Sequence, residues 1–135
     1  MQPSSEVVDA LLNFYVKRTQ ADAASFDDIV STQPTAFIGT APGEWFVDRE
    51  RLRRGFAWAV RLDPGPSPQG WAEGSVGLGA DEPTMTLPDG TVIRTRLTMF
   101  FRREDDAWKV YGYHFSAGVP DEEVQVLQRR WLAGE

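Results

Sequence analysis

The sequence of 135 residues contains no cysteine and only one histidine, His114. The lack of cysteine excludes disulfides, thiolate metal sites and a cysteine nucleophile. A single histidine also disfavours a transition-metal site, because such sites combine several nitrogen, oxygen or sulfur ligands. We therefore expect neither a metal ion nor another cofactor.

Long apolar runs and an excess of basic residues are also missing. No run approaches the ~20 residues of a membrane-spanning helix, and no basic stretch precedes an apolar core at the start, as it would in a signal peptide. Lys and Arg number 14 against 20 Asp and Glu, a net charge of −6. This charge disfavours nucleic acids and anionic membranes as partners. We expect a cytoplasmic protein.

The order of the periodic segments indicates the fold class. The length fits one domain, residues 1–135. Apolar residues at spacings of three and four predict a helix over residues 4–20. A short helical turn is expected at 25–30 and a third helix from Asp48 to about residue 60. The expected apolar side of the first helix comprises Val8, Leu11, Leu12 and Tyr15.

The second half reads as strands separated by turn residues. Strands are predicted at residues 35–39, 69–73, 76–87, 91–103 and 108–117, and the Pro- and Gly-rich residues 62–70 are expected to form a connection. A last helix begins at Pro120, with Val124, Leu127 and Trp131 expected to face inward. This order predicts an α+β fold in which a strongly bent antiparallel sheet wraps around the N-terminal helices.

The turns set the register, and the register decides which side chains face the interior. Pro-Asp-Gly at 88–90 predicts a three-residue loop that pairs Asp81 with Leu97. A turn at 105–106 pairs Phe101 with Val110, and an uninterrupted ladder then pairs Leu97 with His114. The polar residues expected on the interior face are Asp81, Thr95, His114 and Ser116. Those expected on the outer face include Arg94, Arg96, Tyr111 and Tyr113.

Asp81 and His114 are the candidate catalytic residues. A buried carboxylate needs a partner or a proton, and an imidazole titrates near neutrality, so the pair suits acid/base chemistry on opposite walls of a pocket. Two other interpretations stay open. His114 is then a buried imidazole bonded to Ser116 or Thr95, and Asp81 is an exposed charge or a partner of an outer-face arginine.

Aromatic and hydroxyl side chains complete the candidate site. Aromatic walls suit a flat or cyclic apolar ligand, and a tyrosine hydroxyl can donate to a ligand oxygen. Phe46 and Trp71 are also candidates for the pocket mouth, although large aromatics equally fill the core of a small domain. The candidate ligand-binding residues are Tyr15, Trp45, Trp58, Thr95, Met99 and Ser116.

Three segments, at residues 38–46, 80–90 and 101–116, resemble the nuclear transport factor 2-like superfamily and, within it, the SnoaL-like proteins. The last segment is also similar to the end of the association domain of calcium/calmodulin-dependent kinase II. The resemblance implies a cone-shaped α+β barrel that encloses a cavity capped by helices. It also implies a tendency to form homodimers through the outer face of the sheet, and to place acid/base groups on the cavity walls.

Two functions of different classes follow from these patterns. The first is a small-molecule-binding protein with an interior, mostly apolar pocket, in which Asp81 or His114 acts as the base of a cofactor-independent isomerase, cyclase or dehydratase. The second is a non-enzymatic dimerisation or adaptor module that acts through its outer sheet face. An open pocket of a few hundred Å³ favours the first function, whereas a cavity closed by side chains favours the second.

Overall fold

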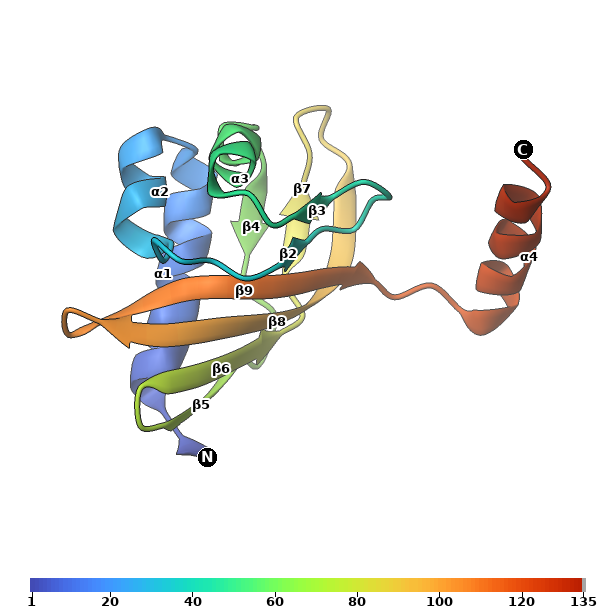
Figure 1. Ribbon diagram of the computed structural model, residues 1–135. Coiled ribbons are helices and arrows are strands. Elements are labelled where there is room, and N and C mark those ends of the chain that lie inside the picture. The colour runs from blue at the N-terminus through green and yellow to red at the C-terminus, as the bar shows by residue number, and fades with distance from the viewer. Residues whose placement is uncertain (135) are drawn as a thin grey trace.

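The computed structural model describes residues 1–134 and contains four helices (Figure 1). They are α1 (Ser5–Gln20), α2 (Ala23–Ile29), α3 (Arg49–Phe56) and α4 (Asp121–Leu132). The predicted helices are all present. α2 begins earlier than predicted because the Asp22 side chain caps it by accepting from the backbone N–H of Ser25. α3 is capped by Asp48 as predicted, but it ends at Phe56.

A curved, unclosed sheet forms the other layer. Its strands follow one another in the order β1-β5-β6-β8-β9-β2-β3, and a β4–β7 pair joins the beginning of β8. All pairings are antiparallel except β2 with β9. The bounds are β1 Gln2–Pro3, β2 Phe37–Ile38, β3 Trp45–Phe46, β4 Arg61–Asp63, β5 Gln69–Glu73, β6 Val76–Asp81, β7 Thr84–Thr86, β8 Val92–Glu104 and β9 Ala107–Ala117. α1, α2 and α3 lie against one side of this bent sheet (Figure 1).

The observed strands differ from the predicted ones mainly where the observed strands are short. The strand expected over residues 76–87 is divided between β6 and β7, because Pro83 has no N–H to donate to a ladder. The strands β1, β3 and β4, two or three residues each, were not predicted, and β4 lies partly in the expected connection. An α+β fold with a bent sheet around helices is confirmed.

The core lies between α1 and the concave face of the sheet. α1 buries Val7, Leu11, Phe14 and Tyr15, so its buried stripe is rotated slightly from the predicted one. β8 contributes its odd-numbered side chains to the core. The buried hydrophobic residues outside α1 are Phe26, Ile29, Val30, Phe37, Leu52, Phe56, Leu62, Leu97, Met99, Phe101, Val110 and Phe115.

A β-bulge at Tyr111 changes the predicted register of the last hairpin. The turn at Asp105 and Asp106, both with positive φ, pairs Phe101 with Val110 as predicted. The next residue, Phe100, pairs with Gly112, so Tyr111 is an extra residue on β9. A one-residue insertion moves every later side chain of that strand to the opposite face.

The predicted interior placement of His114 and Ser116 is therefore wrong. Beyond the bulge Leu97 pairs with Phe115 and Thr98 pairs with His114. Tyr113 packs against the core, whereas His114 is exposed on the outer face and Ser116 lies half-buried beside it. The pairing of Asp81 with Leu97 agrees with the prediction.

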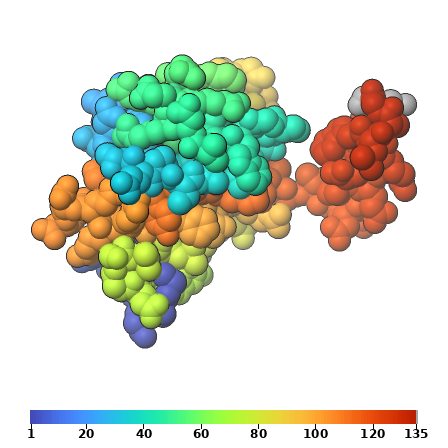
Figure 2. Space-filling model, viewed as in Figure 1, coloured from blue at the N-terminus to red at the C-terminus, as the bar shows by residue number. Residues whose placement is uncertain are grey.

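α4 stands apart from the rest of the chain (Figures 1 and 2). None of its side chains is buried, so the prediction that Val124, Leu127 and Trp131 face inward is wrong. In a single copy of the chain, the apolar side chains of α4 therefore stay accessible to solvent. Within residues 1–134, no helix combines the length and the apolarity that a membrane crossing requires.

Candidate functional site

Asp81 lies at the end of β6, where it joins three elements. Its Oδ2 accepts from the Tyr15 hydroxyl at 2.8 Å and from the backbone N–H of Gly65 at 2.9 Å. The residue is only 7% exposed, so the interior placement of Asp81 and Tyr15 is confirmed. Burial first, and then the hydrogen bond and charge of Asp81, raise the pKa of Tyr15 above its ordinary value. Tyr15 therefore acts as a neutral donor.

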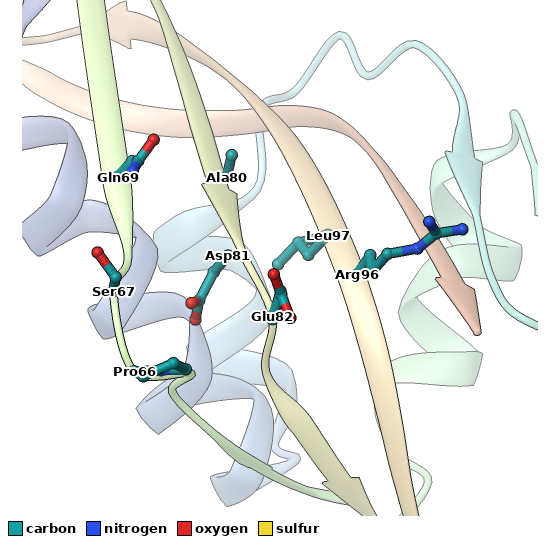
Figure 3. A pocket seen from close by; sticks show the side chains of 8 residues that line it. All are labelled: Pro66, Ser67, Gln69, Ala80, Asp81, Glu82, Arg96 and Leu97. Carbon is teal, nitrogen blue, oxygen red and sulfur yellow. The ribbon is translucent and has the colours of Figure 1, made fainter. Parts of the chain in front are cut away.

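The second oxygen of Asp81, Oδ1, has no hydrogen-bond partner among residues 1–134. It is covered by the chain at Gly65, where an added Cβ would lie 2.6 Å from it. A pocket of about 360 Å³ lies beside this carboxylate, and in Figure 3 Arg96 extends away from Asp81. The pocket is lined by Pro66, Ser67, Gln69, Ala80, Asp81, Glu82, Arg96 and Leu97. Through the two hydrogen bonds of Oδ2, Asp81 connects α1 and the loop at Gly65 to the sheet.

The remaining predicted site residues are spread over the molecule. The Thr95 hydroxyl donates to the backbone oxygen of Pro83 at 2.8 Å, and Met99 is fully buried in the core. Trp45 is exposed on β3. The structure brings Asp81 together with Tyr15, but His114 and Ser116 lie on the opposite face of the sheet, so the predicted Asp81–His114 constellation does not form.

A larger cavity, here called the cleft, opens between α3, the β2–β3 hairpin and the last turn of α1. Its volume is about 590 Å³. An inner cavity of about 80 Å³ lies towards the core and shares Arg18, Glu44 and Tyr113 with the cleft, so these residues lie between the two. The other lining residues of the cleft are Pro42, Gly43, Phe46, Arg51, Leu52, Arg54, Gly55, Phe56 and Trp58.

Arg18 extends the buried stripe of α1, seven residues after Leu11. Its Nη1 donates to the backbone oxygens of Phe56 (3.1 Å) and Trp58 (2.7 Å), and its Nη2 to that of Gly55 (3.5 Å). These carbonyls belong to the C-terminal end of α3, where the helix dipole favours a cation. Burial lowers the pKa of Arg18, but a guanidinium stays protonated in proteins.

Tyr113 reaches the cleft because of the β-bulge. Its ring packs edge-on against Phe37 and Phe115, with centroids 4.8 and 5.0 Å away. Burial raises the pKa of its hydroxyl to about 12, although the charge of Arg18 opposes this shift. The hydroxyl is therefore protonated at neutral pH, and it makes no hydrogen bond with any residue from 1 to 134.

Glu44 forms the third polar wall of the cleft. The β2–β3 turn is closed by Gly39 N–H donating to the Glu44 backbone oxygen at 2.8 Å. The Glu44 Oε1 accepts from the Ala41 backbone N–H at 2.7 Å. The absence of a Cβ at Gly39 permits this fold-back, since a Cβ there would lie 2.7 Å from Oε2.

The mouth of the cleft is aromatic and basic. Trp58 is 74% exposed there, and the Arg51 guanidinium lies 5.1 Å from the centroid of Phe46. Arg54 lines the same opening. No three His, Cys, Asp or Glu side chains come together as metal ligands in the described part of the chain.

Comparison with known proteins gives structural relatives only. No family model matches the chain, and no curated protein matches it. A nuclear transport factor 2-like protein of unknown function from Pseudomonas putida KT2440 superposes with a TM-score of 0.72 at 14% identity, covering 88% of this chain and 89% of its own. The chain has the nuclear transport factor 2-like fold.

Two further structures with this fold carry provisional functional names. One, from Streptomyces avermitilis, is provisionally named a dehydratase; its TM-score is 0.68 at 17% identity, over 85% of this chain and 95% of its own. The other, from Xanthomonas campestris, is provisionally named a calcium/calmodulin-dependent protein kinase II association domain; its TM-score is 0.67 at 15% identity, over 90% and 96%. At these identities the likeness concerns the fold alone.

The sequence predicted part of the cleft. Phe46 and Trp58 were expected at a pocket mouth and do line it. Arg18, Glu44 and Tyr113 were missed. Arg18 carried a readable signal, because it follows Val7, Leu11 and Phe14 at helical spacing and so continues a buried stripe with a charged residue.

Proposed function

We propose that the chain binds a small organic molecule in the cleft. The carrying observation is the convergence of Arg18, Glu44 and Tyr113 at the neck of a space of about 590 Å³, within the ~300–1,000 Å³ typical of ligand sites. The inner cavity of about 80 Å³ is too small for such a molecule. The ligand therefore lies at the mouth of the cleft, against Phe46 and Trp58, and not in the interior expected from the sequence.

A fragment screen by ¹⁵N-edited NMR tests this proposal. Bound fragments are expected to shift the signals of Arg18, Glu44, Trp58 and Tyr113. Trp58→Ala is expected to weaken the best fragment about 5–10-fold, because the indole supplies apolar contact area at the mouth. Trp131→Ala is the matched control, since Trp131 is also exposed but lies on α4. Fragments that shift only residues around Asp81, or none at all, would exclude the cleft.

The chemistry that these groups support is proton transfer at carbon without a cofactor, as in an isomerase, cyclase or dehydratase. We propose that Glu44 is then the base, while Arg18 and the neutral Tyr113 hydroxyl stabilise the developing oxyanion. The proposal replaces the predicted pair of Asp81 and His114. The provisional dehydratase name of one structural neighbour supports this class of reaction.

The second candidate function, dimerisation, is supported by the outer face of the sheet. Trp71, Leu78 and Phe100 pair successively across β5, β6 and β8, and the Tyr111 ring lies 6.2 Å from that of Phe100. These four residues form one apolar row on the face opposite the core. Tyr113, which was expected on this face, is not part of it.

α4 supports a second copy of the chain as the occupant of this face. A helix of 12 residues is marginal alone in water, and α4 packs on nothing within its own chain. Its first turn carries Asp121, Glu122 and Glu123, which complement the exposed Arg94 and Arg96 of the outer face. We propose a homodimer, in the cytoplasm, in which each α4 lies on the partner's sheet.

Phe100→Asp is expected to convert this dimer to a monomer, because a carboxylate in the middle of the apolar row would be buried without a partner. Light scattering coupled to size exclusion measures the change. Val16→Asp is the matched control, since Val16 is exposed on α1, away from the outer face of the sheet. A wild-type monomer at micromolar concentration, or a Phe100→Asp dimer, would reject this interface.

A further inference from the structure

The charge of the cleft is opposite to that of the chain. Three arginines, Arg18, Arg51 and Arg54, line it against one carboxylate, Glu44. The whole chain carries a net charge of −6. A basic concave surface on an acidic protein concentrates anions locally. The charge therefore favours an anionic ligand, in place of the mostly apolar one expected from the sequence.

The hydrogen bonds of Arg18 leave one edge of its guanidinium unused. A guanidinium has five N–H groups in a plane. Two N–H groups on Nη1 and one on Nη2 donate to the carbonyl oxygens at the end of α3. The Nε–H and the other N–H of Nη2 have no acceptor among residues 1–134. These two groups share one edge, which is the arrangement that binds a carboxylate through two parallel hydrogen bonds.

Two neighbours restrict the anion further. The Tyr113 hydroxyl is a neutral donor that makes no hydrogen bond within residues 1–134, and Tyr113 lines the shared neck of the two cavities together with Arg18 and Glu44. Glu44 adds a negative charge at the same place. A second negative charge on the ligand would be repelled there, so a monoanion fits the neck better than a phosphate dianion.

We infer that the ligand of the cleft carries a single carboxylate, bound by the open edge of Arg18 and by the Tyr113 hydroxyl, and a flat apolar body that lies against Phe46 and Trp58. This inference rests on the proposed function, since it names the class of molecule that the same cleft takes. Arg51 and Arg54 attract the anion from the mouth but do not hold it.

Three matched probes test the charge requirement by ¹⁵N-edited NMR titration of the full chain. They are 2-naphthoate, its uncharged counterpart 2-naphthamide, and the dianion 2-naphthyl phosphate. The naphthoate is expected to bind in the cleft at least tenfold more tightly than either of the others. Equal binding of the amide in the cleft overturns the carboxylate while the proposed function stands. Tighter binding of the phosphate overturns the monoanion.

Two variants test the residues. Tyr113→Phe keeps the ring and removes the donor, and it is expected to weaken naphthoate about fivefold while leaving naphthamide unchanged. Arg18→Met is expected to abolish the preference for the acid. Because Arg18 also caps α3, the thermal unfolding of the Arg18→Met variant is measured alongside its binding. If Arg18→Met does not fold, the effect of Tyr113→Phe alone decides whether the cleft recognises the carboxylate. Arg130→Met, on α4, is the control and is expected to bind as the wild type.

The outcomes separate the two levels of the proposal. If a general fragment screen finds ligands in the cleft but the acids show no advantage over their amides, the inference fails and the binding function survives. If neither the probes nor any other fragment shifts residues of the cleft, both fail. Naphthoate shifts confined to the outer-face arginines Arg94 and Arg96 also contradict the inference.

Discussion

Asp81→Ala is expected to lower the free energy of unfolding by about 3 kcal/mol, as measured by urea denaturation. The substitution leaves the Tyr15 hydroxyl and the Gly65 N–H without their acceptor, and each buried unpaired donor costs about 1–3 kcal/mol. The substitution also removes a buried carboxylate oxygen, Oδ1, that lacks a partner, and this partly offsets the loss of stability. The net loss is therefore smaller than the sum of two full penalties.

Two further variants show whether the loss comes from these hydrogen bonds. Tyr15→Phe removes one donor and keeps the ring, so it should cost about 1–2 kcal/mol. Glu82→Ala, at the exposed neighbour, should change stability by less than about 0.5 kcal/mol. Binding in the cleft should survive in Asp81→Ala whenever the variant is folded. If Asp81→Ala lost ligand binding without losing stability, Asp81 would belong to the binding site.

The fold could be predicted as far as regular periodicity extends. α1, β8 and the 88–90 turn follow from helical spacing, from alternation and from a Pro-Asp-Gly break. The bulge at Tyr111 has no local residue signal of its own. The bulge is visible only as a change in the alternation of β9. Its inward apolar residues are even-numbered up to Val110 and odd-numbered from Tyr113. Assuming an uninterrupted ladder placed His114 inside.

The cleft could not be predicted because it is assembled by contacts between distant segments. Ile38 pairs in parallel with His114, and the resulting position of the β2–β3 hairpin brings Glu44 to Tyr113. A strand of two residues is too short to show an alternating pattern, so residues 37–46 contain no signal that predicts this pairing. α4 was misplaced for a related reason. Its apolar stripe predicts burial against some surface, and the sequence was read as placing that surface within the same chain.

Raising the pH from 10 to 12 is expected to destabilise the fold by about 2 kcal/mol per pH unit on average, through Tyr15 and Tyr113. Burial raises the pKa of both hydroxyls, to about 12 for Tyr113. An unfolded tyrosine ionises near pH 10, so above this pH the unfolded chain releases protons that the folded chain retains. Each retained proton removes about 1.4 kcal/mol of stability per pH unit, whereas below pH 10 the contribution of both groups is fully present.

Single variants separate the two contributions in chemical denaturation curves recorded at successive pH values. Tyr113→Phe should remove about half of the slope between pH 10 and 12, because only Tyr15 then retains its proton. Tyr15→Phe should leave a slope that flattens near pH 12, where Tyr113 ionises in the folded chain as well. A slope that neither variant changes would show that both hydroxyls reach water. In that case the Tyr113 hydroxyl would be hydrated in the folded chain, and a ligand of the cleft would have to displace that water.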